Sequence, residues 1–143
     1  MDILNTFRVS GSALKAQSMR LNTISSNLAN VETTSTPEGG PYKKKSVIFQ
    51  STPSTFQEQL EGNLKNGVQG VTVTKIAEDN TPPRKVYNPS HPDAKEDGYV
   101  EMPNISVLEE MVDMMSATRS YQANVTSIKM AKRMAMKALE IGR

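Results

Sequence analysis

The chain has 143 residues, no cysteine and a formal net charge of +2, and 36% of its residues are hydrophobic. This length suits one domain, or a small domain carried on a helical stem. The lack of cysteine excludes a disulfide framework, a thiolate metal site and a cysteine nucleophile, and the small net charge argues against nucleic-acid binding.

The N-terminal region shows no targeting or membrane-spanning pattern. No apolar run approaches the ~20 residues needed to cross a bilayer. The basic-then-apolar pattern of a cleaved signal peptide is missing, because Asp2 comes early and polar residues soon follow it. These features predict a cytoplasmic protein, or one that is exported by a route that reads no cleaved signal.

Residues 1–31 are predicted to form a long helix. Positions spaced alternately four and three residues apart form a heptad seam: Ile3, Phe7, Ser10, Leu14, Gln17, Leu21, Ile24 and Leu28. Gly11 lies inside this segment, where glycine costs about 1 kcal/mol relative to alanine. Ser10 and Gln17 are polar at seam positions. The isolated helix is therefore weak, and we expect it to be ordered only when it packs against a partner.

Residues 32–103 are predicted to form a β-rich middle region with irregular, extended loops. It opens with turn-forming Asn, Thr, Ser, Pro and Gly that show no periodicity. Strands are predicted over residues 42–50, 68–77 and 84–87, and a short helix near residues 56–64. Residues 88–98 are predicted to be a loop fixed by its prolines.

Two polar features of this middle region have alternative interpretations. Lys43, Lys44 and Lys45 form either an anion site or a solvated strand edge, and we favour the edge. His91, the only histidine, lies near Asp93 in a polar loop, which is compatible with a metal site. Because no second histidine or cysteine is available, we favour an exposed His91 that binds no metal.

Residues 104–143 are predicted to form a second long helix. Ser106, followed three residues later by Glu109, gives its start a capping-box pattern. A heptad seam follows one side: Met111, Met114, Thr118, Tyr121, Val125, Ile128, Lys132, Ala135 and Leu139. A second apolar stripe lies on roughly the opposite side: Leu108, Val112, Met115, Met130, Met134 and Ile141. A surface helix ordinarily has one apolar face, so two such faces predict packing from both sides.

The two seams together predict an α+β fold that is mainly α, with the terminal helices paired as an antiparallel coiled coil beside the small middle region. The intrachain seam would comprise Ile3, Phe7, Leu14, Leu21, Ile24, Leu28, Met111, Met114, Tyr121, Val125, Ile128 and Leu139. The other side of the second helix would meet neighbouring subunits through Leu108, Val112, Met115, Gln122, Asn124, Met130 and Met134.

The sequence carries no pattern typical of catalysis. It has no glycine-rich phosphate loop, no serine-elbow pattern and no paired metal-ligand motif. A dispersed carboxylate pair would leave no such pattern, but nothing singles one out. We therefore predict a protein that is not an enzyme and has no cofactor, metal or small-molecule substrate.

Two segments resemble the bacterial flagellar rod and hook protein family. Residues 25–45, SSNLANVETTSTPEGGPYKKK, are similar to the amino-terminal signature of that family. The matching positions are Asn27, Ala29, Asn30, Thr33, Tyr42 and Lys43. The link between Thr33 and Tyr42 is longer than the general pattern, as in the proximal-rod branch. Residues 86–143 resemble the same branch in their Pro-Ser-His-Pro-Asp-Ala run and in their Arg-Ser-Tyr-Gln-Ala-Asn-Val block, whereas residues 46–85 have no distinctive match.

The resemblance implies a non-catalytic structural subunit of the flagellar basal-body rod, the drive shaft that crosses the periplasm and houses the export channel. It implies export through the flagellar type III apparatus without a cleaved signal. It also implies contacts with copies of the same chain, with the rod subunits FlgB, FlgF and FlgG, and with FliE at the base.

Three alternatives stand beside this interpretation. Another rod-family subunit, similar to FlgB, would share the same two signatures. A coiled-coil adaptor or chaperone with a small β module would pair its heptads stably as a free protein. A small hydrolase acting on the cell wall would need an acid–base pair, and the sequence shows no candidate.

Overall fold

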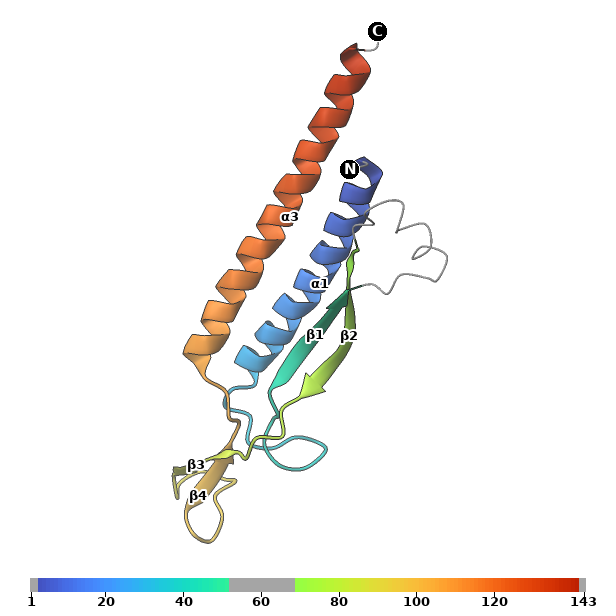
Figure 1. Cartoon of the computed structure of the whole chain (residues 1–143). Helices are drawn as coiled ribbons and strands as arrows, with labels where there is room; N and C mark the ends of the chain where they lie inside the picture. Colours follow the sequence, from blue (N-terminus) through green and yellow to red (C-terminus); the bar gives the residue numbers. More distant parts are fainter. Residues whose placement is uncertain (1–2, 52–68, 142–143) are drawn as a thin grey trace.

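The computed structural model describes residues 3–51 and 69–141 (Figure 1). Helix α1 (Ile3–Ala29) and helix α3 (Val107–Ile141) lie side by side and run in opposite directions, so both termini lie at the same end. Two antiparallel hairpins complete the fold, β1 (Lys45–Ser51) with β2 (Val71–Glu78) and β3 (Arg84–Tyr87) with β4 (Tyr99–Met102). The predicted helix-rich α+β fold is confirmed. The short helix predicted near residues 56–64 lies outside the described residues.

Helix α1 is the middle layer of the molecule. It contacts α3 on one side and the β1–β2 hairpin on another (Figure 1). Ala16 and Ile24 are buried at 3% and 4% exposure, whereas Arg8, Gly11 and Lys15 lie on the stripe that faces water. Two packed faces explain how a helix with an internal glycine and polar seam positions is ordered, because burial offsets its weak intrinsic propensity.

The β1–β2 hairpin alternates between a covered and an exposed face. Val47 and Phe49 of β1 and Val71 of β2 are partly buried, whereas Ile48 is 41% exposed. The register shifts between Ile48 and Phe49, which marks a β-bulge. The backbone amide of Val71 donates a 3.0 Å hydrogen bond to the Ser12 hydroxyl, tying the hairpin to α1.

The β3–β4 hairpin lies at the end of the molecule remote from the C-terminus (Figure 1). Its Tyr87 and Tyr99 rings meet edge to face, with centroids 5.3 Å apart. Gly98 precedes β4 with a φ of +74°, and a Cβ there would approach Tyr87 Cε2 to 2.9 Å, so this turn requires glycine. No strand was predicted over residues 99–102, because a four-residue segment has little pattern of its own and gains its conformation by pairing with β3.

The face of α3 that contacts α1 is rotated from the predicted seam. Its most buried residues are Glu110, Ala117 and Ala131, at 1%, 0% and 2% exposure. Met111 and Leu139, predicted on the seam, are 51% and 75% exposed. The two alanines let the helix backbones approach closely, which places the bulkier side chains on the flanks of the contact.

The other predicted seam residues occupy varied positions. Ile24 is buried, and the partly buried set is Phe7, Leu14, Leu21, Leu28, Met114, Val125 and Ile128. Tyr121 is 38% exposed. The side chain of Ile3 lies outside the described part of the chain. The last turns of α3 project beyond α1, which accounts for the exposure of Leu139 (Figure 1).

Candidate assembly surface and its supporting network

A buried polar network joins α1, β1 and α3, and Asn27 lies at its centre. The Asn27 side-chain Nδ2 donates to the Lys45 carbonyl at 2.8 Å and to Glu110 Oε2 at 3.0 Å. Its Oδ1 accepts from the Lys45 backbone amide at 2.9 Å and from the Tyr42 hydroxyl at 3.2 Å. Asn27 is 1% exposed, so its amide acts as a bridge between three segments rather than as a surface group.

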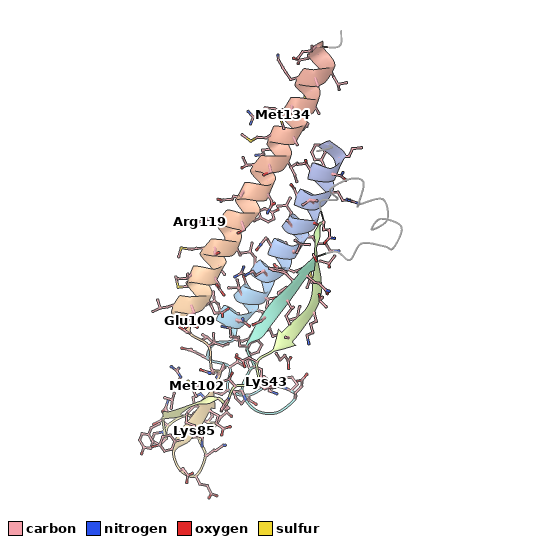
Figure 2. The ribbon with its side chains drawn as sticks, viewed as in Figure 1. Lys43, Lys85, Met102, Glu109, Arg119 and Met134 are labelled. Atoms are coloured by element: carbon pink, nitrogen blue, oxygen red, sulfur yellow. The ribbon has the colours of Figure 1, made fainter. Side chains whose placement is uncertain are left out.

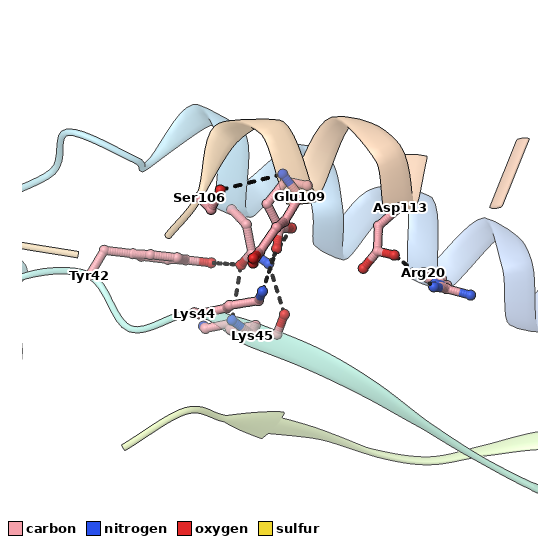
Figure 3. A network of polar contacts seen from close by, with 9 residues as sticks. Arg20, Tyr42, Lys44, Lys45, Ser106, Glu109 and Asp113 are labelled. Carbon is pink, nitrogen blue, oxygen red and sulfur yellow. Dashed lines mark hydrogen bonds and ion pairs between the residues drawn. The ribbon is translucent and has the colours of Figure 1, made fainter. Parts of the chain in front are cut away.

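Glu110 carries the buried negative charge of this network. Lys44 Nζ lies 2.8 Å from Glu110 Oε1, and the hydrogen bond to this carboxylate raises the pKa of Lys44 above its ordinary value of 10.5. Nearby, Arg20 of α1 lies 3.4 Å from Asp113 of α3 (Figure 3). A polar groove of about 310 Å³ opens beside these pairs. Because the four charged groups neutralise one another, the arrangement fixes the packing of three elements.

The opposite face of α3 carries exposed apolar side chains near its start and in its second half, with Arg119 between the two groups (Figure 2). Leu108, Val112 and Met115 are 76%, 59% and 54% exposed near its start. Met130 and Met134 are 57% and 61% exposed in its second half. Figure 2 shows Arg119 and Met134 on the side of α3 that points away from α1.

The two predicted polar members of this surface are placed differently. Gln122 is exposed, whereas Asn124 is partly buried and donates from Nδ2 to the Ser120 carbonyl at 2.9 Å. Asn124 also falls on the same side of α3 as Ala117 and Ala131, one heptad from each. Its position therefore belongs to the α1-facing side of the helix.

The part of the chain that the structure describes has no cluster of metal-binding side chains. No group of three or more potential metal ligands gathers among residues 3–51 and 69–141. His91 Nδ1 instead accepts a 3.1 Å hydrogen bond from the Asp93 backbone amide. No helix in these ranges is long and apolar enough to span a membrane.

Comparison with known proteins identifies the family. The chain matches the family described as "Flagella basal body rod protein" over residues 7–35, and "Flagellar basal body rod FlgEFG protein C-terminal" over residues 96–141. It is 45% identical to the flagellar basal-body rod protein FlgC of Bacillus subtilis (strain 168) over the full length of both chains. The chain belongs to the FlgC family of flagellar basal-body rod proteins.

Other FlgC proteins are similar to this chain over nearly their full length. The FlgC of Salmonella typhimurium is 44% identical over 99% of each chain. The FlgC of Borreliella burgdorferi is 42% identical, over 99% of this chain and 98% of its own. As a member of the FlgC family, the chain is a structural subunit of the rod in the flagellar basal body.

The residues that match the amino-terminal signature of the rod and hook proteins fold the loop after α1 back onto that helix. The Thr33 hydroxyl donates to Asn30 Oδ1 at 3.2 Å, and the Tyr42 backbone amide donates to the Thr33 carbonyl at 3.1 Å. The Tyr42 hydroxyl then reaches Asn27. Ala29 and Lys43, in contrast, are exposed. The signature is therefore largely a set of contacts that closes the long link between residues 34 and 41.

The three consecutive lysines divide between two environments. Lys43 is exposed, whereas Lys44 and Lys45 reach carboxylates, Lys44 that of Glu110 and Lys45 Nζ that of Glu78 at 3.6 Å. The preference for a solvated edge therefore overlooked the role of Lys44.

The role of Glu110 was not predicted from the sequence. Glu110 does lie at heptad spacing with Ala117, Asn124 and Ala131. The predicted seam followed the large apolar residues and therefore did not include this row.

Proposed function

We propose that this FlgC-family chain builds the proximal part of the rod as a drive shaft, with the α1–α3 pair as its inner layer and the hairpins outside. The proposal assigns torque transmission to the packed helices, because a close-packed interior resists shear. In this proposal the α1–α3 pairs of successive subunits surround a central channel through which exported subunits pass. No catalytic role is part of this proposal.

The observation that carries the proposal is the exposed apolar face of α3, formed by Leu108, Val112, Met115, Met130 and Met134. Burying a large apolar side chain stabilises a protein by about 1.5–3 kcal/mol, so leaving these side chains in water forgoes that gain. Methionine adapts its shape to differing neighbours, which suits a surface that contacts more than one kind of subunit. Neighbouring rod subunits that cover these side chains would explain why they are exposed in the single chain.

The proposed neighbours are copies of the same chain, the rod subunits FlgB, FlgF and FlgG, and FliE at the base. Delivery through the flagellar type III apparatus, without a cleaved signal, is part of the same proposal. Support comes from the rod-protein names of the relatives and from the full-length match to them. The exposed helix face supplies the surface through which such contacts would form.

The experiment is to place a charge on this face, using Met115→Asp and Met130→Asp separately. Both side chains are more than half exposed, so the free chain should fold normally. We expect incorporation into isolated basal bodies to fall at least tenfold and motility to be lost. Asn80→Asp, which adds the same charge in an exposed loop, is the matched control. Normal motility of both methionine variants would contradict the proposal.

A further inference from the structure

Gly11 occupies a position where the chain itself has no need of glycine. It lies inside α1 on the exposed stripe, and a Cβ added there would meet nothing within 4 Å. Alanine at an exposed helix interior is more favourable than glycine. A close approach of another chain to this position would account for the glycine.

The start of α3 presents a bulky surface, in contrast to the open position at Gly11. Leu108, Met111, Val112 and Met115, which we call the α3 patch, are each more than half exposed. Near Gly11, the stripe of α1 instead carries the small Ser18 and the long stems of Arg8 and Lys15. Gly11 and Ser18 leave two shallow positions between the longer side chains of this stripe, and these can receive the bulky α3 patch because small residues let helix backbones approach closely.

Arg119, one turn beyond Met115, is an exposed cation on the α3 side (Figure 2), but one unpaired charge beside the α3 patch, that of Glu109, is opposite in sign to those of Arg8 and Lys15 on α1. Within residues 3–51 and 69–141, Arg8 and Lys15 have no ion pair, and neither has the exposed Glu109 beside the α3 patch. The other acidic groups of that part of α3 already have partners, Glu110 in Lys44 and Asp113 in Arg20. Glu109 is thus the carboxylate left to meet a cation from another molecule.

We infer that the α3 patch of one copy packs on the exposed face of α1 around Gly11 in a second copy, with Glu109 near Arg8 and Lys15. The inference rests on the proposed function and names the surface that covers part of the exposed α3 face. Both surfaces point away from the helix contact inside one chain, so they meet only between chains. Such a contact joins two different surfaces, and it can therefore repeat from copy to copy around the rod.

Disulfide trapping tests the contact directly, because the chain has no cysteine of its own. Two copies, one with Gly11→Cys and the other with Val112→Cys, are expressed together and assembled into basal bodies. Oxidation should yield a disulfide-linked dimer of this chain, because a disulfide needs Cα atoms about 4.4–6.8 Å apart. The amount of dimer should be at least tenfold higher than for the control pair of Lys75→Cys with Val112→Cys. Absence of the dimer, or a disulfide to a protein of different mass, would overturn the inference.

Substitution of Gly11 separates assembly from folding. Gly11→Leu should leave the melting temperature of the free chain unchanged or higher, yet lower incorporation into the rod at least tenfold, with Gly11→Ala intermediate. Normal incorporation of Gly11→Leu would refute the contact at α1. The proposed function would still stand in that case if Met130→Asp were excluded from the rod, and it would fail as well if Met130→Asp assembled normally.

Discussion

Asn27 Nδ2 donates a 3.0 Å hydrogen bond to Glu110 Oε2, between residues 83 positions apart in the sequence. Both side chains are 1% exposed. The bond joins the C-terminal end of α1 to the first turn of α3. Asn27 also holds the start of β1, because its Nδ2 donates to the Lys45 carbonyl and its Oδ1 accepts from the Lys45 backbone amide. Since an unpaired buried charge is costly, only one mutual placement of these three segments satisfies the network.

Removing the Glu110 carboxylate should destabilise the free chain strongly. Glu110→Ala leaves Lys44 and Asn27 without their partner, and breaking a buried pair costs about 3–5 kcal/mol. Glu110→Gln should cost less, because the amide oxygen still accepts from Asn27. Urea unfolding of the free chain measures both effects. The exposed neighbour Glu109 supplies the control, since Glu109→Ala should cost less than about 1 kcal/mol, and equal costs at positions 109 and 110 would refute the role given to the network.

The Lys44–Glu110 pair predicts a loss of stability at alkaline pH. Hydrogen bonding to Glu110 raises the folded-state pKa of Lys44 above 10.5, so the folded chain holds this proton more tightly than the unfolded chain. The stabilisation is therefore fully present below pH 10.5 and is lost as the pH rises through the folded-state pKa. Thermal unfolding between pH 9 and pH 12 should show a steeper decline for the native chain than for Lys44→Met. If the melting temperatures of the two chains fell equally with pH, the pair would contribute nothing to the loss of stability at alkaline pH.

Substitutions in α3 should show which of its ridges faces α1. Ala117 is 0% exposed, so Ala117→Leu should overpack the helix contact and cost about 1–3 kcal/mol. Met111 is 51% exposed, and Met111→Ala should cost less than about 1 kcal/mol. The melting temperatures of the two variants give the comparison. A larger loss for Met111→Ala would place the contact on the ridge predicted from the heptads.

Ser106 supplies one of the two hydrogen bonds of the predicted capping box at the start of α3. Its hydroxyl lies 3.5 Å from the Glu109 backbone amide, one residue before the helix begins at Val107. Ser106→Ala should destabilise the chain by about 1 kcal/mol, and Ser106→Asp should retain most of the capping energy because its carboxylate also accepts from the helix N-terminus. Unfolding midpoints measured side by side check both values, and an alanine variant as stable as the native chain would exclude the cap.

Much of the fold was predictable from local signals. The heptad spacing from Met111 to Leu139 predicted α3, the strand pattern over residues 68–77 predicted β2, and Ser106 predicted the cap. Each of these depends on residues close together in the chain, where period and propensity are informative.

The details of packing could not be predicted in the same way. The heptad pattern followed the largest apolar residues, such as Met111, whereas the helices meet along Glu110, Ala117 and Ala131. Small and buried charged residues carry little weight in an apolar pattern, and their role appears only when a distant residue such as Asn27 provides the partner. Strand β4 was missed for the same reason, since its structure depends on pairing with β3.

The central claim is that neighbouring rod subunits cover the outer face of α3. Methionine oxidation followed by mass spectrometry tests it most directly, with the free chain compared with the chain in isolated basal bodies. Met115, Met130 and Met134 are 54%, 57% and 61% exposed in the single chain and should oxidise readily there. We expect their oxidation rates to fall at least tenfold in the assembled rod. Equal rates in the free and assembled chain would contradict it.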